Sequence, residues 1–160
     1  HENTSQGAIV LDGSENASVR FSPCCRPIPG DAIVGYLGRG EGLAVHVEDC
    51  PVARKLRHKD AERFIGVEWS DEPVRAFETG IVVTVSNGKG VLAKVAAALA
   101  AAEADIVHVD MGSEAQQNDA ELRFVVAVRD SAHLQTALRN LSRTASVLSA
   151  KRRKVASPNV

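Results

Sequence analysis

All three cysteines of the chain lie between residues 24 and 50. Cys24 and Cys25 are adjacent, and His46 precedes Cys50 in a His-x3-Cys spacing. Thiolate and imidazole groups are the ligands that tetrahedral zinc takes. If the intervening chain folds back as a hairpin, both ends of this set meet at one point. Cys24, Cys25, His46 and Cys50 are therefore a candidate structural zinc site, in which four protein ligands leave no open position for catalysis.

A second interpretation treats these cysteines as small buried apolar side chains, which is a common role for free cysteine. Zinc ligands more often occur as Cys-x2-Cys pairs, because adjacent side chains of an extended chain point apart. We therefore expect Cys25 to be the weakest ligand of the set, with Cys24 as the alternative weakest ligand. An odd number of cysteines without a leader sequence favours reduced thiols or metal ligands over disulfides.

The elements that must position this set are short strands and turns. Residues 18–22 alternate polar and apolar side chains and lead into the cysteine pair, and Pro27-Ile28-Pro29-Gly30 predicts a rigid turn. Two strands, 32–37 and 42–47, joined by a glycine-containing loop, predict a β-hairpin. In the second strand we expect Leu43, Val45 and Val47 on one face, with the alternating Ala44 and His46 on the other.

Cys50-Pro51 is expected to open a short helix, because proline is tolerated in the first helical turn. One further strand is predicted over residues 64–69, and the polar run Ser70-Asp71-Glu72-Pro73 marks the boundary between the first unit and the next. We expect a linker over residues 1–17 with one weak strand at its short apolar run, then a cysteine module over 18–70, a second domain over 76–154 and a tail over 155–160.

The second domain alternates strand and helix periods in the order β-α-β-β-α-β. Alternation predicts strands over 76–86, 105–112 and 121–129, with a final strand over 147–153. Helical spacing predicts two helices, whose apolar positions are Val91, Leu92, Val95, Leu99 and Ala102 in the first and Leu134, Ala137, Leu138 and Leu141 in the second. The fold class is α+β: a small β-hairpin and helix module followed by a ferredoxin-like βαββαβ domain.

Two families of small regulatory domains share this plan, RNA-recognition domains and amino-acid-binding ACT domains. RNA recognition needs aromatic residues on the third strand that stack on bases, and Phe124 is the only aromatic residue within 121–127. Small residues before the first helix, by contrast, expose backbone N–H groups that can hold a ligand carboxylate. The alternative is a plain strand-to-helix turn. The candidate ligand-binding residues are Asn87, Gly88, Lys89, Gly90, Val91 and Leu92.

Composition narrows the function classes. The 160 residues carry a net charge of −1, so binding to nucleic acid needs a local patch such as Lys151-Arg152-Arg153-Lys154. No apolar run is long enough to span a membrane, and we expect a cytoplasmic protein. There is no phosphate-binding loop and no nucleophile elbow, so we expect no active site. The first residue, His1, indicates a piece of a longer chain.

The run Cys24 to Asp31, followed by Gly40-x-Gly42 and Val45-His46-x3-Cys50, resembles the conserved-cysteine, zinc-finger-like domain of the long RelA/SpoT proteins. These are the bacterial bifunctional (p)ppGpp synthetase/hydrolases of the stringent response. The following domain resembles their C-terminal ACT domain, and the two together cover residues 18–154. Arg26 and Ile33-Val34 look more like the SpoT or Rel branch than the RelA branch.

This resemblance implies a non-catalytic sensor region, with hydrolase and synthetase domains upstream in the parent chain. The parent would be a GTP/GDP pyrophosphokinase, a (p)ppGpp 3′-pyrophosphohydrolase, or both. The implied partners are those catalytic domains, the ribosome and its RNA, a branched-chain amino acid, and a second copy through the ACT domain. Two alternatives stay open: an RNA-binding, ribosome-docking module that uses the sheet and the basic tail, and a dimerisation module.

Overall fold

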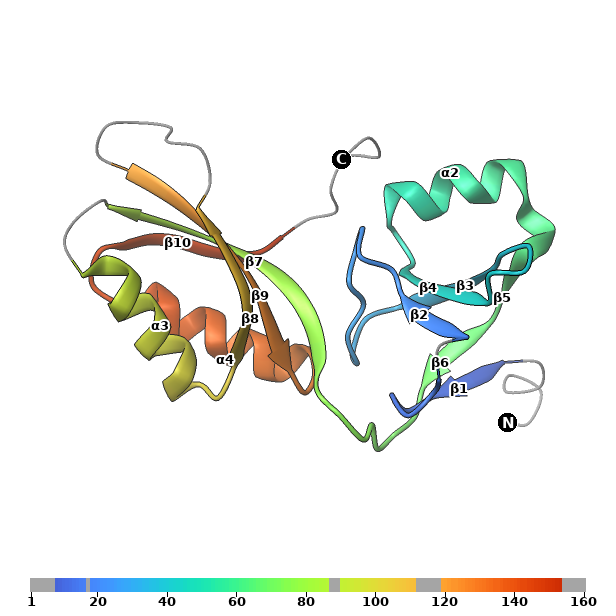
Figure 1. Ribbon diagram of the computed structural model, residues 1–160, viewed down its shortest axis with the longest axis horizontal. Coiled ribbons are helices and arrows are strands. Elements are labelled where there is room, and N and C mark those ends of the chain that lie inside the picture. Colours follow the sequence, from blue (N-terminus) through green and yellow to red (C-terminus); the bar gives the residue numbers. More distant parts are fainter. Residues whose placement is uncertain (1–7, 17, 87–89, 112–118, 154–160) are drawn as a thin grey trace. The chain divides into compact units, whose positions relative to one another are not determined.

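The computed structural model describes residues 8–16, 18–86, 90–111 and 119–153. The chain forms two compact units, with the boundary between Phe77 and Glu78. The first module, which ends at Phe77, is blue to green in Figure 1, and the second module, Glu78–Arg153, is green to red. Within the described ranges, no helix is long and apolar enough to cross a membrane.

The first module is built on a four-stranded sheet in the order β2-β4-β3-β5. The predicted hairpin is present, since β3 (Ile33–Leu37) and β4 (Leu43–Val47) pair antiparallel. Strand β2 (Val19–Phe21) runs parallel to β4 and places Phe21 opposite Val45. Helix α2 (Pro51–Lys59) follows β4 directly, with proline in its first turn.

Strand β4 is buried on both faces. Leu43 and Val45 pack in one cluster with Leu11, Ile33 and Val67. On the opposite side Ala44 is 6% exposed and His46 is 4% exposed. That side packs against the turn and the helix that carry the cysteines. The alternation of polar and apolar residues along one strand does not show which distant segments pack on it.

The single strand expected over residues 64–69 is two strands in different sheets. After the short 3-10 helix η1 (Ala61–Arg63), β5 (Phe64–Ile65) pairs with β3. Strand β6 (Val67–Trp69) pairs in parallel with β1 (Ile9–Leu11). The chain changes sheets at Gly66, whose carbonyl accepts a hydrogen bond from the Ile9 amide at 3.0 Å.

Three aromatic rings pack together in the first module. Phe21 stacks on Trp69 with ring centroids 5.7 Å apart, and Phe77 meets both rings edge-on. The indole N–H of Trp69 donates to the carbonyl of Asp31 at 3.1 Å, which ties this cluster to the proline turn. Trp69 is the only tryptophan of the chain, so its fluorescence reports on the folding of the first module.

The second module has the predicted β-α-β-β-α-β order. Its elements are β7 (Phe77–Ser86), α3 (Val91–Ala101), β8 (Asp105–Met111), β9 (Asp119–Val128), α4 (Ser131–Ser142) and β10 (Val147–Arg152). The sheet order is β10-β7-β9-β8, and both helices lie on one face of it (Figure 1). The α+β prediction with a ferredoxin-like second domain is confirmed.

The core of this module lies between the sheet and the two helices. Strand β9 alternates as predicted, with buried side chains at Leu122, Phe124, Val126 and Val128. Helix α3 buries only Val95 and Leu99, while Leu92 is 41% exposed although helical spacing placed it in the core. This helix therefore packs through a narrow stripe, and all of its alanines are exposed or half-buried.

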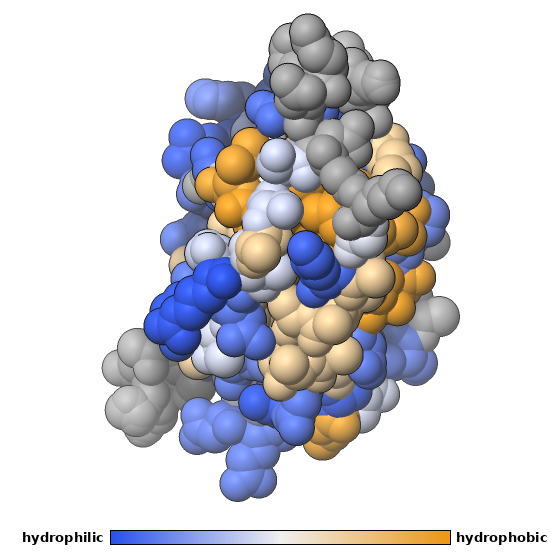
Figure 2. Space-filling model, turned by 90° about the vertical axis from the view of Figure 1, so that its left-hand side faces the viewer, coloured by the Kyte–Doolittle hydropathy of each residue, from blue (hydrophilic) through white to orange (hydrophobic). Residues whose placement is uncertain are grey.

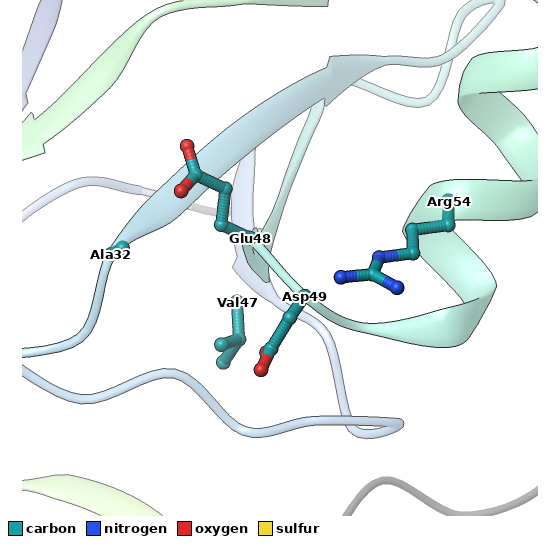
Figure 3. Close-up of a pocket in the computed structure, with 5 residues that line it drawn as sticks. All are labelled: Ala32, Val47, Glu48, Asp49 and Arg54. Carbon is teal, nitrogen blue, oxygen red and sulfur yellow. The ribbon is translucent and has the colours of Figure 1, made fainter.

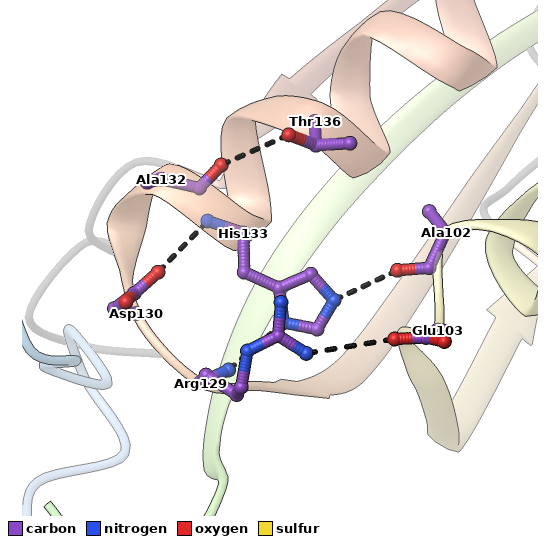
Figure 4. A network of polar contacts seen from close by, with 7 residues as sticks. All are labelled: Ala102, Glu103, Arg129, Asp130, Ala132, His133 and Thr136. Atoms are coloured by element: carbon purple, nitrogen blue, oxygen red, sulfur yellow. Dashed lines mark hydrogen bonds and ion pairs between the residues drawn. The ribbon is translucent and has the colours of Figure 1, made fainter.

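One buried histidine joins the two helices of the second module (Figure 4). The Nδ1 atom of His133 accepts from the Arg129 amide at 3.0 Å, so its Nε2 carries the proton and donates to the Ala102 carbonyl at 2.8 Å. Asp130 caps α4 by accepting from the His133 amide at 2.8 Å. These bonds fix the start of α4 against the end of α3.

Thr79 offers a test of packing in the second module. Its hydroxyl is buried and has no hydrogen-bond partner among the described residues. Because an unsatisfied buried hydroxyl costs about 1–3 kcal/mol, we expect Thr79→Val to stabilise the second module by about 1 kcal/mol in urea unfolding. Thr84→Val, at a half-exposed position, is the control, with an expected change below about 0.5 kcal/mol. A loss of stability for Thr79→Val would contradict this account.

Candidate metal centre

The structure brings Cys24, Cys25, His46 and Cys50 together, although they come from three separate segments. One ligand atom from each residue lies within 4.8 Å of all the others. The Cys24 sulfur is 3.7 Å from that of Cys50 and 3.9 Å from that of Cys25. The His46 Nδ1 atom is 3.4 Å from the Cys24 sulfur. A single metal ion can contact all four residues.

The adjacent cysteines face the same point because the chain is not extended there. The amides of Cys25 and Arg26 both donate to the carbonyl of Ser22, at 3.3 and 2.8 Å, which closes a tight turn. Arg26 has a positive φ of 45°, a conformation that few non-glycine residues adopt. The expectation that adjacent side chains point apart was wrong for this pair, since it assumed an extended backbone.

A backbone amide points at one of the sulfur atoms. The Val47 amide donates to the Cys25 sulfur at 3.2 Å, and Cys50 lies directly before the first turn of α2. Cys50 has no exposed surface, and Cys25 is 9% exposed. Such N–H···S bonds stabilise negative charge on the sulfur, which favours thiolates as metal ligands.

The three thiols do not ionise alike. Hydrogen bonds from Cys25, and then from His46 and Cys50, lower the pKa of the half-buried Cys24 to about 4. The pKa of Cys25 is raised, first by its bond to Cys24 and then by burial. Burial also raises the pKa of Cys50. These opposite pKa shifts favour the thiolate at Cys24 and the neutral thiol at Cys25 and Cys50.

His46 presents its two ring nitrogens to different partners. The Nδ1 atom faces the sulfurs of Cys24 and Cys25, at 3.4 and 3.8 Å. The Nε2 atom lies 3.3 Å from the hydroxyl of Ser22, which is itself 4% exposed. Sequence reasoning missed Ser22; the only available signal was a polar residue at the end of a strand, directly before the cysteine pair.

An open pocket lies beside the cluster, at the start of α2 (Figure 3). It is lined by Val47, which precedes the exposed acids Glu48 and Asp49, and by Arg54 on the helix. Figure 3 shows the two carboxylates pointing in opposite directions. The two acids of this pocket therefore do not converge on one point, in contrast to the buried cluster next to it.

The predicted ligand-binding loop is described only in part, because Asn87, Gly88 and Lys89 lie outside the described residues. Gly90 precedes α3 with a positive φ of 74°, and no described side chain caps the helix there. Its conformation suits glycine, and a side chain at this position would meet no described neighbouring atom within 4 Å. The first turn of α3 has Val91 half-buried and Leu92 exposed.

The fold and the cluster define a class of protein, an α+β chain in which a cysteine and histidine module precedes an ACT-type domain. The family model for the ACT domain matches residues 73–152, and that for the RelA/SpoT RIS domain matches residues 9–70. The chain belongs to the RelA/SpoT family and contains its regulatory RIS and ACT domains. The family resemblance inferred from the cysteine run is confirmed.

Curated relatives agree with this assignment. The chain is 33% identical over 138 residues to the bifunctional (p)ppGpp synthase/hydrolase SpoT of Escherichia coli, covering 86% of this chain and 19% of the relative. It is 27% identical over 146 residues to a GTP pyrophosphokinase of Haemophilus influenzae, covering 91% and 20%. The chain thus spans about a fifth of the length of these relatives.

One solved structure similar to this chain is the ACT domain from the GTP pyrophosphokinase of Chlorobium tepidum. It shows 15% sequence identity and a TM-score of 0.43, and the match covers 49% of this chain and 99% of that one.

Proposed function

We propose that this chain is the regulatory region of a (p)ppGpp synthetase/hydrolase, in which a zinc-structured RIS module and an ACT sensor control catalytic domains of the same polypeptide. The observation that carries the proposal is the convergence of Cys24, Cys25, His46 and Cys50 in a chain with the RIS and ACT domains. Regulation proceeds by population shift, because a ligand or partner that binds one arrangement more tightly favours it.

Two measurements test this function. The chain alone should neither make nor hydrolyse (p)ppGpp, and detectable turnover by the purified chain contradicts the proposal. In the parent protein, Cys50→Ser should change the ratio of synthesis to hydrolysis while the catalytic domains stay folded. Ser14→Ala, an exposed site in the same module, is the matched control and should leave the ratio unchanged.

Zinc is the metal that the cluster fits best. Tetrahedral zinc with Zn–S near 2.3 Å and Zn–N near 2.0 Å places two sulfurs about 3.8 Å apart and a sulfur and a nitrogen about 3.5 Å apart. The cluster has sulfur pairs at 3.7 and 3.9 Å and sulfur–nitrogen pairs at 3.4 and 3.8 Å. An iron–sulfur cluster would hold its ligand atoms further apart. Bound zinc cross-links the turn, β4 and α2, and its role is structural.

The ionisation of the cluster predicts how zinc affinity depends on pH. Cys25 and Cys50 have raised pKa values, so zinc must displace a proton from each, whereas Cys24 is already a thiolate. Protons compete with the metal, and the apparent affinity should therefore rise by about 100-fold per unit between roughly pH 7 and pH 8. Chelator competition across this range measures the slope. A pH-independent affinity would show that both thiols are already ionised.

We place the sensor site of the ACT domain at residues 87–92, with a branched-chain amino acid as its ligand. The N-terminus of α3 supports this, because backbone N–H groups in a first helical turn can hold a carboxylate. Titration calorimetry with valine, isoleucine and leucine tests the assignment. Leu92→Glu places a negative charge beside the ligand carboxylate and should weaken binding, whereas Ala101→Glu, exposed at the other end of α3, should not. Absence of heat with all three amino acids rejects this ligand class.

A second candidate function, docking on ribosomal RNA, is favoured by helix α2. Arg54, Lys55, Arg57, His58 and Lys59 are all exposed, and the helix contains no acidic residue. Basic side chains at this density attract phosphates. Replacing Lys55 and Lys59 by alanine should reduce the salt dependence of RNA binding. The slope of the logarithm of the binding constant against the logarithm of the salt concentration should become shallower by about 0.7 to 0.9 for each phosphate that is no longer neutralised. The same test on residues 151–154 examines the basic tail, and an unchanged slope in both variants rejects RNA docking.

Dimerisation through the ACT domain is supported by a strand edge that pairs with no further strand among the described residues. All seven residues of β8, Asp105–Met111, are exposed at the edge of the sheet, among them Val107 at 49% and Met111 at 60%. Figure 2 looks onto the side of the second module that carries α3, where further apolar side chains gather. Edge strands of this kind pair with other chains. Sedimentation at high concentration should detect a dimer that Val107→Lys weakens, and a monomer would contradict it.

A further inference from the structure

We propose that Ser22 is a positioning residue of the metal centre: its hydroxyl accepts the Nε2–H of His46 and thereby directs Nδ1 to the metal. This inference rests on the zinc site of the proposed function and assigns a role to a residue outside the ligand set. The role of Ser22 follows from the different chemistry of the two nitrogens of the His46 imidazole ring. A neutral imidazole has one N–H donor and one bare nitrogen, and the hydrogen bond made by one nitrogen decides which of them can bind a metal.

The register of the sheet places Ser22 beside His46. Phe21 lies opposite Val45 in the parallel pair β2 and β4, and the next residue, Ser22, donates its amide to the Val45 carbonyl at 3.0 Å. This backbone bond holds the serine against the histidine that follows Val45. The Ser22 hydroxyl then reaches Nε2 of His46 at 3.3 Å, with both side chains more than nine-tenths buried.

The opposite edge of the ring faces the sulfurs. Nδ1 is 3.4 Å from the Cys24 sulfur and 3.8 Å from the Cys25 sulfur. With Nε2–H donated to Ser22, Nδ1 carries no proton and faces the two sulfurs with which it would hold the metal. Outer hydrogen bonds of this kind fix the orientation of a ligating histidine, and their loss typically weakens metal binding by about 10- to 100-fold.

The backbone of Ser22 has a separate task from its hydroxyl. Its carbonyl accepts the amides of Cys25 and Arg26 that close the turn, and its own amide pairs with β4. Ser22→Ala removes only the hydroxyl and keeps these bonds. The substitution therefore separates the positioning of His46 from the folding of the turn.

The experiment measures zinc affinity by chelator competition in the wild-type chain and in three variants. Ser22→Ala should bind zinc at least about 10-fold more weakly, whereas Ser22→Thr, which retains a hydroxyl, should stay within about 3-fold of the wild type. Ser14→Ala removes an exposed hydroxyl of the same module and should leave the affinity unchanged. Equal affinity of Ser22→Ala and the wild type overturns the proposal.

A second measurement does not depend on how the variants fold. Long-range 1H–15N NMR correlations of the zinc-loaded wild type should show His46 with protonated Nε2 and metal-bound Nδ1. Metal on Nε2 overturns the positioning role while leaving the zinc site intact. If the wild type binds no zinc, the zinc site and this inference both fail, so the two failures are distinguishable.

Discussion

Replacing Cys50 by serine should remove zinc from the chain and unfold its first module. Cys50 is fully buried, and its sulfur joins the start of α2 to the cysteine turn. Structural zinc sites contribute apparent binding free energies of about 10–16 kcal/mol. A hydrophobic core in a module this small supplies roughly 3–5 kcal/mol, so the metal decides whether the module folds. Bound zinc should fall from about one equivalent to none in elemental analysis.

Trp69 gives the structural readout of this experiment. Its ring stacks on Phe21, and its fluorescence should lose the cooperative unfolding transition in Cys50→Ser. Wild-type chain treated with a strong chelator should behave in the same way, and added zinc should restore it. Helical signal from the second module should persist in both samples. Retained zinc together with an unchanged Trp69 transition would rule out a structural metal at Cys50.

The second large effect is expected in the core of the ACT domain. Phe124 on β9 is 2% exposed among the side chains beneath the two helices. Its replacement by alanine removes a large buried ring and leaves a cavity, which costs about 3–5 kcal/mol. The urea midpoint of the second module, followed by circular dichroism, should fall by about 2 M.

Val125→Ala is the matched control, because Val125 is the next residue of the same strand and is only half-buried. We expect it to cost about 1 kcal/mol or less. Trp69 fluorescence should be the same in both variants, since it reports on the first module. Equal shifts for Phe124→Ala and Val125→Ala would show that β9 does not have one buried face.

In the second module, local pattern and observed structure agree closely. Alternation over Leu122, Phe124, Val126 and Val128 predicted both the strand and its buried face, because one side of this sheet packs on helices and the other does not. Helical spacing likewise found Val95 and Leu99. It overestimated the burial of Leu92, which is 41% exposed, because spacing alone does not show which turns of a helix are covered by the rest of the fold.

The sequence by itself determined the family, the order of the elements and the four residues of the candidate metal centre, because residue types and their spacing are local properties. Only the tertiary structure decided that both adjacent cysteines face one point, since this depends on a turn with a positive φ at Arg26. Likewise, only the pairing of β2 with β4 places Ser22 beside His46. Contacts between residues far apart in sequence leave no periodic signal, and they appear only when the strands are paired.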